Sequence, residues 1–167
     1  MQLYIVRHGI AVDREAPKCP PDPDRFLTDE GKEKTRQVAK GLSKLGVVAE
    51  IFWSSPYVRA MQTAEIFADE LDYSRQKIRR TDLLLPGADS TLLFRELAKD
   101  KDSASVFLFG HAPHLDDVLA SALGIKHQIT SMKKAGVALV ELRRISPPSG
   151  QLLWLGTPKL LRNTGGK

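Results

Sequence analysis

The stretch Val106-Phe107-Leu108-Phe109-Gly110-His111 decides the fold that we expect for this chain of 167 residues. Its first four residues are a continuous apolar run, which is typical of a strand buried on both faces of a parallel sheet. The run ends at Gly110-His111, and Pro113 follows at a position that favours the first turn of a helix. We therefore expect a central strand that ends at a histidine and leads into a helix.

The same order of strand and helix recurs toward the N-terminus. Residues 2–6 alternate in a β-rich pattern, and residues 51–54 form a second short apolar run. Between them, a helical pattern extends over about 28–45, with Thr28 as its N-cap and Gly46 at its end. These patterns predict two further strands joined by a helix.

Two more helices are expected in the middle of the chain. Ser55 and Pro56 have the residue types of an N-cap followed by proline at the first helical position, so we expect a helix to begin there. Asp89 or Ser90 would cap a shorter helix that extends through Leu97. Strands that alternate with helices favour a mostly parallel sheet with helices on both faces.

The C-terminal part of the chain has a different pattern. Residues 136–142 and 152–155 are strand-like, and the turn residues 147–150 join them, which predicts an antiparallel hairpin at the sheet edge. The expected fold is α/β: a three-layer sandwich with a mostly parallel central sheet, helices on both faces and a C-terminal antiparallel hairpin. We expect one domain over residues 1–161 and a frayed tail over 162–167.

Composition narrows the classes of function. The net charge of +5 and the sequence pI of about 9.4 permit anionic partners, but no nucleic-acid-binding motif accompanies the scattered basic residues. We expect no nucleic acid and no membrane partner, because no apolar run could span a bilayer and the N-terminus lacks a signal-peptide pattern. One cysteine, Cys19, agrees with a cytoplasmic protein, and no closely spaced ligand cluster suggests a metal or other cofactor.

Chemically distinctive residues follow three of the predicted strands. Arg7-His8 follows the first, Ser54-Ser55 precedes Arg59 after the second, and His111 follows the apolar run 106–109. Because ligands bind outside the carboxyl ends of the strands in such sheets, we expect these side chains to meet at one edge. The sequence therefore predicts a site with two histidines and two arginines.

This combination suits phosphoryl transfer. Two guanidinium groups can bind the oxygens of a phosphoryl group bidentately and stay charged at any working pH. Their positive charge would lower the pKa of His8 and favour the neutral, nucleophilic imidazole. His8 would accept the phosphoryl group and water would release it, while His111 would stabilise the phosphoryl oxygens by its charge or by a hydrogen bond.

Four blocks of sequence resemble the histidine phosphatase superfamily, which is also called phosphoglycerate mutase-like. They are the strand with Arg7-His8-Gly9, the segment Leu27-Thr28 with Gly31, the run Ser54–Ala64 that contains Arg59, and Gly110-His111. The blocks occur in the order expected for the family. The short chain and Arg7-His8-Gly9-Ile10-Ala11 most resemble the SixA-type protein phosphohistidine phosphatases.

The resemblance implies a role for each matched residue. His8 is the implied nucleophile, and Arg7, Arg59 and His111 complete the phosphate pocket, with Gly9 among the substrate-binding residues. The implied substrate is a phosphohistidine on a signalling protein such as a histidine phosphotransfer domain. No metal and no cofactor are implied.

Two features favour a protein substrate over a metabolite. Residues 73–104 provide only a connector and one short helix where larger relatives carry a helical cap, so the pocket should be open. Residues 80–87 contain no glutamate to serve as the proton donor of metabolite-directed relatives. Asp82 is the nearest possible acid, with a structural or surface role as the alternative, and Asp13 is the weaker candidate. An imidazole leaving group needs such an acid less than an alkoxide does.

Two alternatives stay open. The first is a general small phosphomonoesterase, or a mutase, on the same fold. The second is a non-catalytic phosphate-binding module, which the presence of all four pocket residues disfavours. His114 and His127 lie outside the predicted core of the site.

Overall fold

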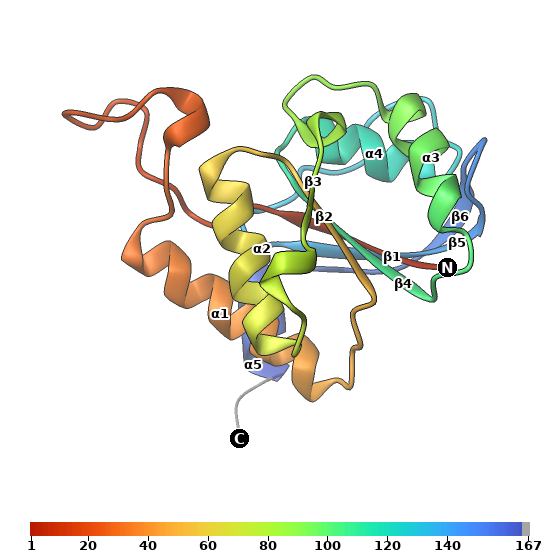
Figure 1. The fold of residues 1–167 in the computed structure, drawn as a ribbon, viewed down its shortest axis with the longest axis horizontal. Helices are drawn as coiled ribbons and strands as arrows, with labels where there is room; N and C mark the ends of the chain where they lie inside the picture. The colour runs from red at the N-terminus through yellow and green to blue at the C-terminus, as the bar shows by residue number, and fades with distance from the viewer. Residues whose placement is uncertain (165–167) are drawn as a thin grey trace.

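A six-stranded sheet forms the centre of the molecule, and helices cover both of its faces (Figure 1). The computed structural model describes residues 1–164. Along the sheet the strands lie in the order β3-β2-β4-β1-β5-β6. Their bounds are Gln2–Arg7 (β1), Ile51–Ser54 (β2), Arg79–Arg80 (β3), Ser105–Gly110 (β4), Val137–Arg144 (β5) and Ser149–Gly156 (β6).

The described part of the chain contains five α-helices and four short 3-10 turns besides the strands. The helices are Asp29–Lys44 (α1), Val58–Glu70 (α2), Ser90–Leu97 (α3), His114–Ala122 (α4) and Pro158–Thr164 (α5). The turns are Asp22–Asp24 (η1), Arg75–Lys77 (η2), Asp82–Leu84 (η3) and Ala98–Asp100 (η4). Thr28 caps α1 by accepting a hydrogen bond from the Gly31 backbone N–H, as the sequence predicted.

The sheet is parallel except at one side. Strand β4 pairs in parallel with both β1 and β2, and β2 pairs in parallel with β3. Strand β5 runs antiparallel to β1 and forms an antiparallel hairpin with the edge strand β6. The predicted fold class, with its mostly parallel core and C-terminal hairpin, is confirmed.

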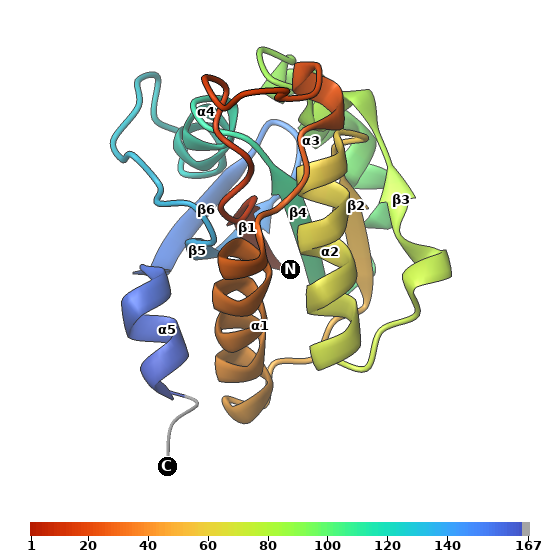
Figure 2. The ribbon, with the colours of Figure 1, turned by 90° about the vertical axis from the view of Figure 1, so that its left-hand side faces the viewer.

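Each face of the sheet has its own apolar core. Helices α1, α2 and α5 pack on one face, where they meet Tyr4 and Val6 of β1. Helices α3 and α4 pack on the other face, over Leu3 and Ile5. Alternate residues of β1 therefore point to opposite layers, and the view in Figure 2 shows the two groups of helices on either side of the sheet.

Helix α2 begins later than the sequence predicted. Its first residue is Val58, and the preceding Tyr57 provides no side-chain cap. Ser55 and Pro56 lie before the helix, and the Ser55 backbone N–H bonds to the carbonyl of Phe109 in the neighbouring strand. The pairing between β2 and β4 thus extends one residue into the segment where the sequence predicted the helix start.

Two other features of the structure differ from those that the sequence predicted. The basic connector contains the short edge strand β3, which the sequence did not indicate. Helix α5 continues to Thr164, so residues 162–164 of the predicted tail are helical, and residues 165–167 lie outside the described residues.

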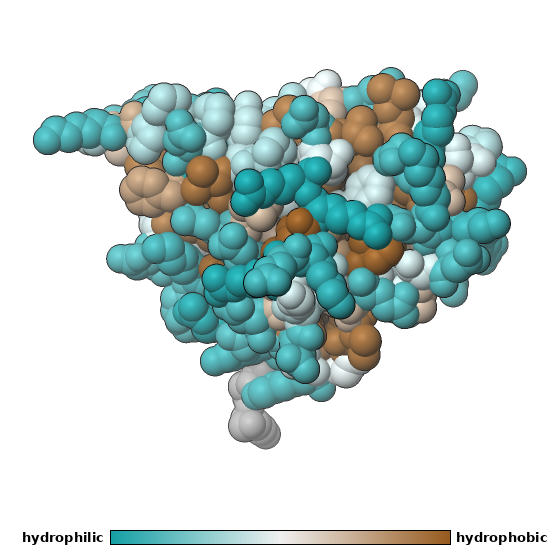
Figure 3. All heavy atoms as spheres, in the orientation of Figure 1, coloured by the Kyte–Doolittle hydropathy of each residue, from teal (hydrophilic) through white to brown (hydrophobic). Residues whose placement is uncertain are grey.

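The visible surface is mostly hydrophilic. Figure 3 shows hydrophobic residues in separate patches on that face, divided by polar side chains. Among the described helices, none is long and apolar enough to cross a membrane.

Candidate active site

Strand register brings the two predicted site histidines together. In the parallel pair, Arg7 of β1 lies opposite Gly110 of β4, so His8 and His111 each follow at the same level. The His8 backbone N–H also donates to the Gly110 carbonyl, and the two imidazole ring centres lie 5.2 Å apart. The chain leaves β1 toward α1 on one face and leaves β4 toward α4 on the other. Ligand sites of open α/β sheets lie at such a point, outside the carboxyl ends of the strands.

Hydrogen bonds to both ring nitrogens orient His8. Its Nδ1 lies 2.7 Å from the Gly9 carbonyl oxygen, which can only accept, so Nδ1 carries the proton. The Arg59 Nε–H donates to His8 Nε2 at 3.3 Å, which requires a lone pair on that nitrogen. We assign the neutral tautomer with Nε2 unprotonated from this network.

Burial is the main cause that keeps His8 neutral. Burial, and to a smaller extent the charges of Arg59, Arg7 and Lys134, together lower the pKa of His8 to about 3. The hydrogen bond to Gly9 acts in the opposite direction. The sequence predicted that the arginine charges lower the pKa of His8. Burial of the ring lowers that pKa more than the charges do.

Gly9 fits a position where a side chain would not. A Cβ on Gly9 would lie 2.4 Å from Oγ1 of Thr35, far closer than a normal contact. The Gly9 backbone N–H donates to Thr63 Oγ1, and its carbonyl holds His8. The carbonyl thus orients the histidine and the N–H anchors Gly9 to α2, while the role of Gly9 in substrate binding stays a prediction.

Three buried side-chain nitrogens have no hydrogen-bond partner among the described residues: Nε of Arg7, Nε1 of Trp53 and Nδ1 of His111. Of these residues, Arg7 and His111 line the catalytic cleft. Arg7 donates from Nη1 to the Met132 carbonyl, and His111 Nε2 lies 2.8 Å from Ser55 Oγ, so both side chains are otherwise fixed. Buried polar atoms are usually paired, so unpaired ones in a cleft are candidates for contact with a ligand.

Burial also keeps His111 neutral in the unliganded protein. Burial, followed by the charges of His8 and Arg59, lowers the pKa of His111 to about 2. A neutral His111 can still donate one hydrogen bond. Its ring is edge-on to Tyr57, with ring centres 5.2 Å apart, so its orientation is well determined.

Asp22 is part of the site and was not identified from the sequence. Arg59 is 2% exposed, and its two terminal nitrogens bond to the Asp22 backbone carbonyl and to Asp22 Oδ2. Burial raises the pKa of Asp22, but the hydrogen bond from Arg25 and the charge of Arg59 outweigh that effect and leave it below its usual value. The loop over residues 10–27 therefore supplies a carboxylate that contacts the arginine beside His8. The only signal in the sequence was the unusual length of that loop.

The site opens into a cleft of about 790 Å³. The strand ends contribute Arg7, His8, Arg59 and His111 to its lining, together with residues of the loop and Lys134. Of the predicted acids, Asp13 lines the cleft beside Glu15, whereas Asp82 is exposed in η3 and is not among the lining residues. Within residues 1–164 there is no group of three or more His, Cys, Asp or Glu side chains arranged to hold a metal ion.

Other proteins share these features. The model of the histidine phosphatase superfamily (branch 1) matches residues 3–84, which contain Arg7, His8 and Arg59. An uncharacterized protein of Picosynechococcus sp. is 38% identical over 141 residues, which cover 82% of each chain. The chain therefore belongs to the histidine phosphatase superfamily.

Two similar proteins are described as phosphatases. The structure of the protein histidine phosphatase SixA complexed with tungstate superposes with a TM-score of 0.84 and 28% identity, covering 95% of this chain and 98% of that one. The mitochondrial serine/threonine-protein phosphatase Pgam5 of Drosophila persimilis is 31% identical over 86 residues, 52% of this chain and 28% of its own. This chain, too, is a phosphatase.

Proposed function

We propose that this phosphatase hydrolyses phosphohistidine on a protein, with His8 as nucleophile and a phosphorylated His8 as the covalent intermediate. The observation that carries the proposal is the position of the His8 ring, whose Nδ1 faces the Gly9 carbonyl and whose Nε2 faces the Arg59 guanidinium, so that the lone pair is assigned to Nε2. A buried, neutral imidazole beside fixed cations has the reactivity and the surroundings that attack on a phosphoryl group needs.

The proposed reaction has two displacements. The lone pair of His8 Nε2 forms a bond to phosphorus as the bond from phosphorus to the substrate imidazole nitrogen breaks. The leaving nitrogen takes up a proton from solvent or from an acid of the cleft. Water then attacks phosphorus as the bond from phosphorus to His8 Nε2 breaks. Inorganic phosphate leaves, the proton of the attacking water passes to solvent, and neutral His8 is restored. The unpaired donor of Arg7, together with Arg59 and His111, would bind the oxygens of the transferred group.

The leaving group favours phosphohistidine. Asp82 lies outside the cleft lining, so the acid that the sequence placed first has no short path to a leaving group there. Asp13 lines the cleft, but one of its carboxylate oxygens accepts a hydrogen bond from the Glu15 backbone. An imidazole, which is protonated near neutral pH, needs less help than an alkoxide. The similarity to SixA, a protein histidine phosphatase whose structure holds tungstate, also favours phosphohistidine as the substrate.

The test compares wild type, His8→Ala and His127→Ala on a histidine-phosphorylated peptide, phosphoserine and p-nitrophenyl phosphate. His127 is an exposed histidine and the matched control. We expect His8→Ala to lose about 10⁴-fold or more in kcat on each substrate that the wild type hydrolyses. We expect a kcat/KM for phosphohistidine at least about 100-fold above that for phosphoserine, which corresponds to about 3 kcal/mol.

Two results would contradict different parts of the proposal. Undiminished activity of His8→Ala would exclude His8 as the nucleophile. Comparable turnover of phosphoserine and phosphohistidine would leave a phosphatase of wider range, the general phosphomonoesterase that the fold also permits. A phosphorylated His8, detected by mass spectrometry after rapid quenching at alkaline pH, would support the covalent step directly.

A further inference from the structure

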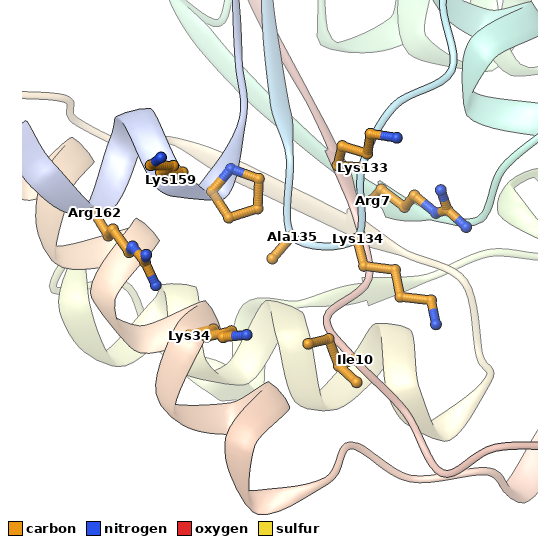
Figure 4. A pocket seen from close by; sticks show the side chains of 9 residues that line it. Arg7, Ile10, Lys34, Lys133, Lys134, Ala135, Lys159 and Arg162 are labelled. Atoms are coloured by element: carbon orange, nitrogen blue, oxygen red, sulfur yellow. The ribbon is translucent and has the colours of Figure 1, made fainter.

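A second hollow lies beside the catalytic cleft, between α1, α5 and the segment that precedes β5. Its volume is about 520 Å³. We call it the basic groove. Six of the residues that line it are cationic: Arg7, Lys34, Lys133, Lys134, Lys159 and Arg162. Figure 4 shows them in two groups: Lys34 of α1 and Arg162 of α5 point toward the space in front of Ala135, whereas Arg7, Lys133 and Lys134 extend on the other side of that residue.

The positive charge of the basic groove is largely uncompensated. None of the described residues that line it carries a carboxylate, and among their ion pairs only that of Lys34 with Glu30 supplies an acidic partner. Lys133 and Lys159 are exposed and form no described ion pair. Like charges that are held close together raise the free energy of the unbound protein, and an anionic partner would relieve that repulsion.

The basic groove is continuous with the catalytic cleft. Arg7, Ile10 and Lys134 line both hollows. The Ala135 backbone N–H donates to the carbonyls of Arg7 and His8, at 3.1 and 3.0 Å, which fixes the segment that carries Lys134 against the nucleophile. A chain that presents its phosphorylated side chain to His8 would therefore have its neighbouring residues within reach of the groove.

We infer that the basic groove binds an acidic peptide segment next to the phosphorylated side chain of a protein substrate. This inference rests on the proposed function, since it requires the substrate to be a protein. The apolar residues Ile10, Ala135 and Pro158 give the groove a surface for an aliphatic side chain between the acidic ones. Its lining contains no aromatic ring on which a base would stack, which disfavours single-stranded nucleic acid.

Binding can be tested without any phosphoryl group. The probe is the fluorescein-labelled peptide Glu-Glu-Leu-Glu-Asp-Leu-Glu, measured by anisotropy against its Gln/Asn counterpart. The groove variant is Lys133→Glu with Lys159→Glu. The control is Lys77→Glu with Lys101→Glu, which makes the same change in net charge at exposed lysines outside both hollows.

We expect the groove variant to raise the Kd of the acidic peptide about 10-fold or more, and the control to raise it no more than about threefold. Equal weakening by both variants would show that only net charge matters and would overturn the inference. Tighter binding of a 12-nucleotide single-stranded DNA than of the acidic peptide, lost in the groove variant, would also overturn it.

A kinetic comparison separates this inference from the proposed function. Phosphohistidine peptides with acidic and with neutral flanks are hydrolysed by wild type and by the groove variant. We expect wild type to prefer the acidic flanks by about 10-fold in kcat/KM, and the groove variant to lose that preference. Peptide binding without phosphohistidine hydrolysis would contradict the proposed function alone. Phosphohistidine hydrolysis with no preference for acidic flanks would contradict the groove alone.

Discussion

The protonation state of His8 follows from three contacts that a single residue makes. Its ring is enclosed, its Nδ1 donates to Gly9, and its Nε2 accepts from Arg59. Enclosure of the ring and the contact with Arg59 favour the neutral form, whereas the bond to Gly9 raises the pKa but places the proton on Nδ1 and the lone pair on Nε2. A charged imidazole would have to break the contact with Arg59 or face that guanidinium as a like charge.

The first prediction concerns the pH dependence of catalysis. The pKa of His8 lies at about 3 and that of His111 at about 2, so neither ring takes up a proton in the free enzyme between pH 4.5 and 7. We expect kcat/KM for p-nitrophenyl phosphate, corrected for ionisation of the substrate, to stay flat over that range. The measurement is a pH series in a buffer of constant ionic strength. A fall with a midpoint near 6.5 would mean that the nucleophile titrates as an ordinary histidine.

The second prediction concerns stability, and its sign follows from the same shifts. Below pH 6.5 the unfolded chain protonates these histidines while the folded protein does not, so the unfolded state binds more protons. The contribution of these two histidines to the free energy of unfolding is therefore fully present above pH 6.5. It is lost as the pH falls toward 3. Each such histidine contributes a slope of up to about 1.4 kcal/mol per pH unit. The measurement is urea unfolding of wild type and His8→Asn at pH 7, 6 and 5. The free energy of unfolding should change less with pH in the variant than in the wild type.

The position of Arg59 depends on a contact between two elements that are distant in the sequence, and no local sequence pattern indicates such a contact. Helix α2 supplies the residue, but η1 of the long loop supplies its partner, and 37 positions separate Asp22 from Arg59. Sequence reasoning found His8, His111 and Arg59 because strands of a parallel sheet end at the same edge. It missed Asp22 because a hydrogen bond between a loop and a distant helix leaves no periodic signal in the chain.

The third prediction concerns that loop. Asp22 occupies donors of Arg59 that a phosphoryl group would use, so its charge competes with an anionic ligand. We expect Asp22→Asn to strengthen inhibition by inorganic phosphate about threefold. Asp24→Asn, an exposed carboxylate of the same turn, is the matched control and should leave the inhibition constant unchanged. Weaker inhibition in Asp22→Asn would show instead that the carboxylate holds Arg59 in its binding position.

The fourth prediction concerns the first turn of α1. A Cβ on Gly31 would lie 2.0 Å from the carbonyl oxygen of Ile10, so the loop that follows His8 would have to move. We expect Gly31→Ala to cost about 2 kcal/mol of stability and to lower kcat/KM. Gly46→Ala beyond the other end of α1, where φ is +74° and the space is open, should cost about 1 kcal/mol with kcat/KM unchanged. If Gly31→Ala and Gly46→Ala had equal kcat/KM, the contact between α1 and the loop after His8 would not influence the active site.

For the whole molecule, the order of strands and helices could be predicted because hydrophobic patterns report which faces are buried. The continuous apolar run before His111 marked β4 as the central strand, and the structure pairs it on both sides. The pattern at Ser55 and Pro56 placed the helix start too early: Ser55 still bonds to β4 across the sheet, and the helix begins at Val58. The basic groove could not be predicted either, since its lysines come from segments up to 125 positions apart, Lys34 and Lys159 among them.

The last prediction concerns the charge around the catalytic cleft as a whole. Arg7, Arg59 and Lys134 line it, the neighbouring groove adds further cations, and the net charge of the chain is +5. A dianionic substrate should be attracted during its approach, and salt should screen that attraction. We expect kcat/KM for p-nitrophenyl phosphate to fall about threefold to tenfold between 20 and 500 mM NaCl.

A pair of variants assigns that salt dependence to the cleft. Lys134→Met removes a cleft charge, and Lys101→Met removes an exposed charge that lines neither hollow. Since screening acts over roughly 10 Å at 0.1 M salt, the cleft lysine should dominate and its variant should give the shallower salt slope. Thermal unfolding at each salt concentration checks that the protein stays folded. If both variants share the wild-type slope, the salt acts on the bound phosphate contacts rather than on the approach of the substrate.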